Sequence, residues 1–445
     1  MLPKNKALMR HSIQVITLGC SKNTVDTEHL LARLGPSFEI VPEGKHAAVD
    51  YLLVNTCGFI GDAKEESIHT ILHAASAKKN GLVGKLVVFG CLSQRYPDEL
   101  PELIPEVDAW FGARDLSPLL EYLGAPACDE DDTGRVLTGG RKGTAFLKIS
   151  EGCDRRCSYC AIPFIRGPHR SVPMEKLVEE AEGLAASGIK ELVIIAQDTT
   201  YYGIDLYHRR ALAQLLQQLS EVDGIEWIRI HYSYPTDFPD DVLDLMASNP
   251  KICRYMDIPL QHISDNVLAL MHRYIDGEAT RRLIARMRER VPGVVLRTTM
   301  IVGHPGEGKE QFNDLLDFVR EARFERLGAF TYSEEEGTYG AEYLDDDVPE
   351  DEKRRRLDAL MSLQGSISFE WNRSRVGKVV RVLVDDCVDG TLVCRSEYES
   401  PEVDGEILVK CPENIDPQAI CGTFIDVKVI GADEYDLIAE PYYEN

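Results

Sequence analysis

Three cysteines lie close together in the middle of the chain, and they constrain its fold and chemistry more than any other feature. They are Cys153, Cys157 and Cys160, and they follow the apolar run 145–149, which is typical of a β-strand. Soft thiolate ligands at such short spacing select an iron–sulfur cluster or zinc rather than a hard cation. A structural zinc site needs four protein ligands, and no fourth Cys or His pairs with these three nearby. We therefore predict a 4Fe–4S cluster on three thiolates, with one iron open to a small ligand.

The composition of the chain favours metal binding over the two other interpretations, a redox pair and simple packing. The chain has 445 residues and 12 cysteines, and no long apolar segment follows its first residues, as a secretory signal would require. The longest apolar runs, such as 192–196, are much shorter than the roughly 20 residues of a membrane span. We therefore expect a cytoplasmic protein with reduced cysteines and no membrane partner. A net charge of −25 disfavours a general nucleic-acid binder.

Three more cysteines follow a repeated pattern in the first part of the chain. The apolar runs 13–19, 51–56 and 85–90 are rich in β-branched residues, and a cysteine follows each run directly. Helical patterns between the runs predict a parallel, doubly wound α/β sheet, in which ligands bind beyond the carboxyl ends of the strands. One such cysteine is usually a small buried side chain, but three at matching offsets indicate a shared role. We predict a second three-thiolate cluster, held by Cys20, Cys57 and Cys91.

The remainder of the chain predicts two further folding units. After a stretch at 129–140 that we interpret as a linker, strands alternate with helices six times. Six units predict an open (β/α)6 partial TIM barrel with its chemistry at the carboxyl ends of the strands. A charged helix at 350–372 is interpreted as a connector, and short strands from 376 onward predict a small OB-like β-barrel. The remaining cysteines are interpreted as core residues: Cys128, Cys253, Cys387, Cys394, Cys411 and Cys421.

These features together resemble the radical S-adenosylmethionine (SAM) methylthiotransferases over essentially the whole chain. Two departures are visible, because Thr27 stands where Ser is usual and His304 stands where Phe is usual. The resemblance implies a methylthiotransferase domain at 10–126, a radical SAM core at 141–372 and a TRAM domain at 375–443. The matching segments are LGCSKNTVD at 18–26, IRGPHRS at 165–171, QDTTYYG at 197–203, DIPLQH at 257–262, PEVDG at 401–405 and ADEYDL at 432–437.

The resemblance also implies a reaction, and its details are similar to the branch of the family that acts on a ribosomal protein. In that branch, a C–H bond at the β-carbon of an aspartate becomes C–S–CH3, with two 4Fe–4S clusters and SAM as cofactors. SAM serves as methyl donor and as radical source. The radical is needed because an unactivated C–H bond does not react with an acid, a base or a nucleophile. Two alternatives stay open: a sister enzyme that methylthiolates an adenosine in transfer RNA, and a non-catalytic iron–sulfur module that binds RNA.

Five residues are candidates for contact with SAM, whereas the sequence predicts no catalytic side chain. Tyr159 lies between two predicted ligands and is expected beside the adenine, with core packing as the alternative. Gln197 and Gln261 end predicted barrel strands on the active face. Arg297 and Glu307 are further candidates, although charged residues are more often solvated or paired.

The charge of the predicted C-terminal barrel indicates its partner. From Arg375 onward, 6 basic and 16 acidic side chains give a net charge of −10. An OB-like barrel needs a positive groove to bind RNA, so RNA binding is not expected. Complementary charge favours a basic small-subunit ribosomal protein, and we expect the barrel to dock it. The alternative is that these acids only maintain solubility. The reaction also requires an electron donor.

Overall fold

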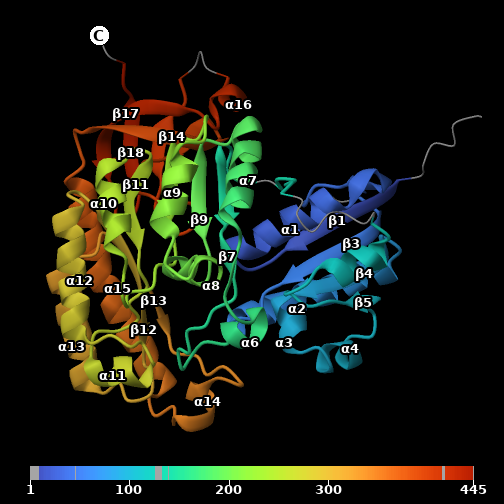
Figure 1. The fold of residues 1–445 in the computed structure, drawn as a ribbon, viewed down its shortest axis with the longest axis horizontal. Helices are drawn as coiled ribbons and strands as arrows, with labels where there is room; N and C mark the ends of the chain where they lie inside the picture. The colour runs from blue at the N-terminus through green and yellow to red at the C-terminus, as the bar shows by residue number, and fades with distance from the viewer. Residues whose placement is uncertain (1–9, 46, 126–132, 139, 413–415, 444–445) are drawn as a thin grey trace, which may run out of the picture. The chain divides into compact units, whose positions relative to one another are not determined.

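The computed structural model describes residues 10–45, 47–125, 133–138, 140–412 and 416–443, and its chain forms two compact units (Figure 1). Cys128 and residues 129–132 and 139 of the predicted linker lie outside the described residues. The three predicted domain boundaries stay predictions. The first unit contains Met1–Thr138, Gly152–Asp154 and Cys160–His169, and the second contains Gly139–Glu151, Arg155–Tyr159 and Arg170–Asn445.

The first unit is built on a five-stranded sheet in which every neighbouring pair is parallel, in the order β2-β1-β3-β4-β5. This arrangement confirms the predicted parallel α/β fold. The two edge strands β2 and β5, of 3 and 2 residues, were not predicted, because such short segments carry little periodicity. The strands are β1 His11–Thr17, β2 Phe38–Ile40, β3 Val49–Thr56, β4 Val83–Gly90 and β5 Ala109–Trp110.

Helices cover this sheet, and apolar side chains from both of its faces form two buried clusters. Strands β3 and β4 are buried along nearly their whole length, which explains why they read as continuous apolar runs. Helix α1 begins at Ser21, directly after Cys20. The helices of this unit are α1 Ser21–Arg33, α2 Gly61–Lys79, α3 Cys91–Arg95, α4 Glu99–Leu103, α5 Ser117–Leu123 and α6 Ile162–Arg166, with a 3-10 turn η1 at Gly35–Ser37.

The second unit contains a six-stranded sheet whose spatial order, β6-β9-β10-β11-β12-β13, follows the order of the chain. All neighbouring pairs are parallel, and the two outer strands do not pair with each other. The predicted open (β/α)6 partial barrel is therefore confirmed. Its strands are β6 Thr144–Lys148, β9 Glu191–Ile195, β10 Trp227–Ile230, β11 Ile252–Asp257, β12 Val295–Val302 and β13 Arg326–Thr331.

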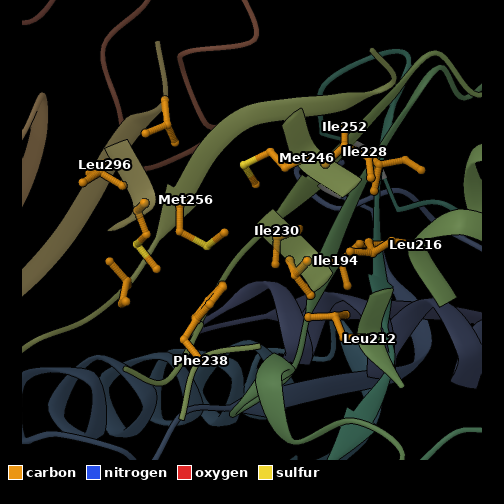
Figure 2. Packing of buried hydrophobic residues seen from close by; sticks show 14 of the residues in the cluster. Ile194, Leu212, Leu216, Ile228, Ile230, Phe238, Met246, Ile252, Met256 and Leu296 are labelled. Atoms are coloured by element: carbon orange, nitrogen blue, oxygen red, sulfur yellow. The ribbon is translucent and has the colours of Figure 1, made fainter. Parts of the chain in front are cut away.

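The core of this partial barrel lies between the sheet and its outer helices. Figure 2 shows Ile194, Ile228 and Ile230 from the strands beside Leu212 and Leu216 from α9. The repeating helices place apolar residues on one side, as their sequence periodicity predicts. They are α7 Met174–Ala186, α9 Leu212–Ser220, α10 Asp240–Ser248, α12 Gly277–Arg290 and α13 Lys309–Ala322.

Shorter elements complete the second unit, together with the long helix α15, which packs against β12, β13 and α13 as predicted for the connector. The short elements lie mostly in the loops after the strands. They are the strands β7 Ser150–Glu151 and β8 Arg170–Ser171, the 3-10 turn η2 Thr199–Tyr201, and the helices α8 Ile204–Tyr207, α11 Asp265–Leu270 and α14 Tyr339–Tyr343. The long helix α15 spans Glu350–Arg373.

The C-terminal part of the second unit is a closed five-stranded barrel in the order β14-β15-β16-β18-β17, as predicted. Inward side chains from all five strands form its core, and Cys394 lies in that core as predicted, while Cys387, Cys411 and Cys421 pack against it. The elements are β14 Val379–Val388, β15 Thr391–Arg395, β16 Ile407–Lys410, α16 Pro417–Ile420, β17 Phe424–Ala432 and β18 Leu437–Pro441.

The C-terminal barrel packs against the amino-terminal ends of the six-stranded sheet. Trp227, the first residue of β10, stacks edge-to-face on Phe424 with ring centroids 4.7 Å apart. Arg326, the first residue of β13, pairs with Glu399 at 3.0 Å. The barrel therefore caps the end of the sheet opposite to the carboxyl ends, where ligands bind in such folds. In the described part of the chain, no helix is long and apolar enough to cross a membrane.

Candidate active site

Cys20, Cys57 and Cys91 lie at the carboxyl edge of the first sheet, directly after β1, β3 and β4. The strand order reverses between β1 and β3, so Cys20 and Cys57 flank the topological switch point at which doubly wound sheets bind ligands. Two glycines show how closely the loops that bear these cysteines approach one another. A Cβ on Gly19 would lie 2.8 Å from the Cβ of Cys57, and one on Gly58 would lie 2.8 Å from the backbone after Cys91.

A buried amide network fixes the ends of β1 and β3 beside these cysteines. Asn23 Nδ2 donates to the carbonyl oxygens of Leu18, at 2.8 Å, and of Thr56, at 3.2 Å. Asn55 Nδ2 donates to the Asn23 carbonyl at 2.9 Å and to Thr27 Oγ1 at 3.0 Å. Because a buried amide left unpaired is costly, this network keeps the loops that bear Cys20 and Cys57 in register. It also gives Thr27 a hydroxyl function that Ser would retain.

The three thiols influence one another electrostatically, as neighbouring metal ligands do. Burial raises the pKa of Cys91 to about 12, although the Arg166 guanidinium partly offsets this, and the neighbouring Cys20 and Cys57 raise it further. Burial likewise raises the pKa of Cys57, and Cys20 raises it further. A bound metal replaces the thiol proton and compensates the thiolate charge. The donor set and its convergence therefore fit a three-thiolate cluster.

The loop that bears the second set of cysteines begins with a glycine that no other residue could replace without movement. Gly152 has a φ of +76°, and a Cβ at this position would lie 2.1 Å from the carbonyl oxygen of Pro168. The next residue, Cys153, donates its backbone N–H to the carbonyl of Gly167 at 3.1 Å. Cys153 and Cys160 belong to the first compact unit, so this unit contains five of the six predicted ligands.

Cys157 belongs to the second unit, where a buried arginine holds its sulfur. Arg273 Nη1 lies 3.4 Å from Cys157 Sγ and 3.4 Å from the hydroxyl of Tyr159. The Arg273 guanidinium stacks over the ring of Tyr234 at 4.2 Å, and the Tyr234 hydroxyl is 3.9 Å from Cys157 Sγ. A guanidinium N–H is a charged donor, and it forms a strong hydrogen bond with a thiolate that binds iron. The sequence did not identify Arg273 because it lies far from the cysteines along the chain.

No group of three or more His, Cys, Asp or Glu side chains within the described ranges is arranged to hold a metal ion. In a 4Fe–4S cluster each thiolate binds a different iron, so the ligand sulfurs lie further apart than they do around one ion. The soft, thiolate-only donor sets found here suit an iron–sulfur cluster and not a hard cation.

The predicted SAM contacts Tyr159 and Gln197 both lie at the carboxyl side of the second sheet. The Tyr159 ring packs edge-on against His304 with centroids 6.4 Å apart, and His304 Nε2 is 3.4 Å from Ser158 Oγ. Burial lowers the pKa of His304 to about 4, so its imidazole is neutral at pH 7. In this environment His304 acts as a flat, uncharged side chain, which is compatible with the Phe that is usual at this position.

Gln197 offers the clearest opening for a ligand. Its Nε2 donates to Glu151 Oε1 at 2.7 Å, whereas its Oε1 is buried and has no hydrogen-bond partner among the described residues. The hydroxyls of Ser150 and Tyr332 are orphaned in the same way. Buried polar atoms of folded proteins are normally paired, so these atoms fit a site that a polar ligand completes.

The other three candidates have different surroundings. Gln261 follows β11 with a left-handed backbone, φ +75°, and its backbone N–H donates to Thr299 at 2.9 Å. Glu307 is buried and accepts from the Gly303 N–H at 2.9 Å and from Arg356 at 2.7 Å. These partners give Glu307 a structural role in the turn after β12, and its contact with SAM stays a prediction.

Arg297 lies in the amino-terminal half of β12, on the side of the C-terminal barrel. Its Nη1 donates to Asp257 Oδ1 at 2.8 Å, and its Nε lies 3.7 Å from Asp404 Oδ1. Arg297 also lines a cavity of about 420 Å³ together with Val403 and Tyr435 of the C-terminal barrel. The structure therefore does not bring Arg297 to Gln197 and Tyr159, and its contact with SAM stays a prediction.

Comparison with family models assigns each part of this architecture to a described family. Residues 147–319 match the Radical SAM superfamily, residues 12–112 match the Uncharacterized protein family UPF0004, and residues 376–441 match the TRAM domain. The partial barrel with its three-cysteine loop thus defines the class of radical SAM proteins.

Curated relatives match the chain over nearly its full length. The ribosomal protein uS12 methylthiotransferase RimO of Flavobacterium johnsoniae is 49% identical over 98% of this chain and 100% of its own. RimO of Porphyromonas gingivalis is 49% identical over 97% of this chain and 99% of its own. This chain belongs to the RimO family of methylthiotransferases, which confirms the resemblance seen in its motifs.

Solved structures share the fold at low sequence identity. The radical SAM methyltransferase TsrM from Kitasatospora setae has a TM-score of 0.55 and 16% identity, over 73% of this chain and 72% of that chain. The cobalamin-dependent SAM radical enzyme OxsB has a TM-score of 0.52 and 14% identity, over 81% of this chain and 56% of that chain. These similarities support the architecture alone.

Proposed function

We propose that this protein is a methylthiotransferase that modifies an aspartate of ribosomal protein uS12 with two 4Fe–4S clusters and SAM as cofactors. The observation that carries the proposal is the presence of two three-cysteine sets in a chain of the RimO family, one after three strands of the first sheet and one in the loop that follows β6 and β7. A 4Fe–4S cluster held by either set would have one iron without a protein ligand, and two such irons would serve a reaction with separate sulfur-transfer and radical steps.

Cys20, Cys57 and Cys91 hold the auxiliary cluster in this proposal. A cluster on three thiolates supplies an open iron that can carry the sulfur to be transferred. The protein positions the ligands through the tight contact of Gly19 with Cys57 and through the Asn23 network.

Cys153, Cys157 and Cys160 hold the radical SAM cluster. Arg273 pairs with the Cys157 sulfur and orients the Tyr159 hydroxyl at the same time, so it couples the cluster ligand to the predicted adenine contact. Gln197 Oε1 accepts a hydrogen bond from an ammonium or hydroxyl group of SAM, because Glu151 already fixes its Nε2. Gln261 lines the same edge of the sheet. The buried His304 and Tyr332 rings, with centroids 5.0 Å apart, exclude water beside Tyr159.

The acidic C-terminal barrel is proposed to dock the basic substrate protein. Some of its acids are committed to internal pairs, since Asp385 and Glu399 bind buried arginines. Others, including Asp386, Asp426 and Glu440, are exposed and retain a surface that attracts a basic protein and repels RNA.

The position of the barrel is compatible with this docking. Strands of 4 to 8 residues separate the two ends of the sheet by roughly 13–26 Å at about 3.3 Å per residue. A small protein of about 30 Å diameter can therefore contact the barrel and still reach the carboxyl ends. We further propose a cytoplasmic location and an external electron donor for the radical step.

The test is an anaerobic reaction of reconstituted protein with SAM, a chemical reductant and either purified uS12 or transfer RNA. We expect uS12 to gain one methylthio group at an aspartate, as measured by peptide mass spectrometry. Replacing Cys157 with Ala should abolish 5′-deoxyadenosine formation, whereas replacing Cys91 with Ala should block methylthio insertion and leave part of that formation intact. Modified transfer RNA with unmodified uS12 would refute the proposal.

A further inference from the structure

Arg166 is a buried arginine of the first unit, and neither the family resemblance nor the predicted sites gives it a role. It ends α6, six residues after Cys160, and only 4% of its surface is exposed. Its Nη1 donates to Asp26 Oδ2 at 2.7 Å, and its Nη2 donates to Asn23 Oδ1 at 2.6 Å. Its Nε is directed at Cys91 Sγ, at 3.2 Å.

The third of these contacts distinguishes Arg166 from a structural ion pair. Asp26 and Asn23 already supply the carboxylate and the amide oxygen that a buried guanidinium needs. A neutral thiol is a weak acceptor, whereas a metal-bound thiolate is a charged acceptor that forms a much stronger hydrogen bond. The Nε–H is therefore directed at an atom that becomes a good partner only when Cys91 is a ligand.

The packing around Arg166 joins two parts of the site within the first unit. Cys91 forms a small buried cluster with Ala113, Ala161 and Ile165, so the segment that leaves Cys160 lies against the loop that bears Cys91. Arg114 fastens the same segment, because its Nε donates to the carbonyl of Ile165 at 3.0 Å. Arg114 therefore contacts the segment through its backbone, while Arg166 connects it to the sulfur.

We propose that Arg166 is a positioning residue for the auxiliary cluster: it hydrogen-bonds the Cys91 thiolate, offsets the cluster's negative charge and ties the ligand loop to the segment after Cys160. This inference rests on the proposed function, since it concerns the cluster of Cys20, Cys57 and Cys91. Hydrogen bonds to ligand sulfurs and nearby positive charge raise the reduction potential of iron–sulfur clusters. Groups that orient a ligand also strengthen metal binding.

The experiment uses the full chain with Cys153, Cys157 and Cys160 replaced by Ala, so that only the auxiliary cluster is reconstituted. In this background, Arg166→Met should release iron to a chelator about 10- to 100-fold faster, the range that loss of a ligand-orienting group produces. Its reduction potential, measured by redox titration with electron paramagnetic resonance, should be more negative. Arg166→Lys keeps the positive charge but loses the planar guanidinium with its several N–H donors. The reduction potential of this variant should therefore lie closer to that of the parent protein than the potential of Arg166→Met does.

Arg114→Met is the matched control, since it loosens the same segment without removing a contact to sulfur. We expect it to leave the potential unchanged. Equal shifts of the reduction potential in Arg114→Met and Arg166→Met would show that Arg166 only holds the segment in place, and this would overturn the inference. If Arg166→Met does not fold, Arg166→Lys decides, because it keeps the charge but lacks the Nε donor to Cys91: iron release as slow as in the parent protein would overturn the inference.

The same experiment separates this inference from the proposed function. A parent protein that binds no iron in the triple-cysteine background would overturn the auxiliary cluster, and the role of Arg166 with it. A parent protein that binds iron, with release and potential insensitive to Arg166, would overturn the role of Arg166 alone.

Discussion

Replacing Arg395 with Ala should destabilise the second unit strongly, because this side chain fastens the C-terminal barrel to the sheet. Arg395 ends β15 and is fully buried. Its Nη2 donates to Glu191 Oε2 at 2.7 Å, and its Nε donates to Asp385 Oδ2 at 2.6 Å. Glu191 is the first residue of β9, so the guanidinium joins a carboxylate of the sheet to a carboxylate of the barrel.

The expected loss of unfolding free energy depends on how well Glu191 and Asp385 remain paired once Arg395 is removed. Breaking a buried ion pair on one side typically costs about 3–5 kcal/mol of unfolding free energy. Burial alone would raise the pKa of Glu191, but Arg395 and Arg229 together lower it to about 2. After the substitution, Arg229 still pairs with Glu191 at 2.9 Å and Arg141 still pairs with Asp385 at 2.7 Å. We therefore expect a loss at the lower end, about 3 kcal/mol.

The assay is thermal unfolding of the cluster-free protein at pH 7, followed by circular dichroism. The second unit contains about 300 residues, and an unfolding entropy of about 2.1 cal/mol/K per residue gives about 0.6 kcal/mol/K. A loss of about 3 kcal/mol therefore corresponds to a decrease in Tm of about 5 °C.

Arg381→Ala is the matched control at the same interface. Arg381 pairs with Glu226 and stacks on Phe424 at 3.9 Å, but its side chain is 48% exposed. Exposed pairs contribute up to about 1 kcal/mol, so its Tm should decrease by less than about 2 °C. Equal decreases in the two variants, or a change below about 2 °C for Arg395→Ala, would refute the argument that the buried network fastens the barrel.

Three further predictions concern SAM binding, acid stability and substrate docking. Gln197→Leu should weaken SAM binding about tenfold, as expected for one lost hydrogen bond of about 1.4 kcal/mol, and equilibrium dialysis should show no change for the exposed Gln217→Leu. The His304 pKa of about 4 lies below the unfolded value of about 6.5, so the unfolded state binds more protons between these values. The unfolding free energy of the wild-type protein should therefore fall by up to about 3 kcal/mol as the pH decreases from 6.5 to 4. In urea unfolding, His304→Phe should not show this loss. Binding of uS12 should weaken steeply as salt rises, and salt-independent binding by fluorescence anisotropy would contradict docking by charge.

The sequence determined the fold class, and it predicted the position of the auxiliary site. Apolar runs with helices between them force a parallel sheet, and parallel strands place every following residue at one edge. This is why the residues after β1, β3 and β4, which are Cys20, Cys57 and Cys91, could be assigned to one site from spacing alone. The structure added that Cys20 and Cys57 flank the point where the strand order reverses, which depends on the pairing of β2 with β1.

Other features were decided only by the tertiary structure, because they depend on contacts between distant segments. Arg273 reaches Cys157 across 116 positions of the chain, and Arg166 reaches Cys91 across 75. The sequence around an arginine does not show whether its side chain contacts the sulfur of a distant cysteine or lies in solvent.

The placement of the C-terminal barrel is a third feature of this kind. The sequence gives its net charge of −10. The sequence does not show that Asp385 and Glu399 form ion pairs with buried arginines. Arg297 was likewise predicted to contact SAM, and only the structure shows that it pairs with Asp257 and lies 3.7 Å from Asp404 of the C-terminal barrel. Composition fixes how much charge a segment carries, and only the packing of segments decides which charges face one another and which remain for a partner.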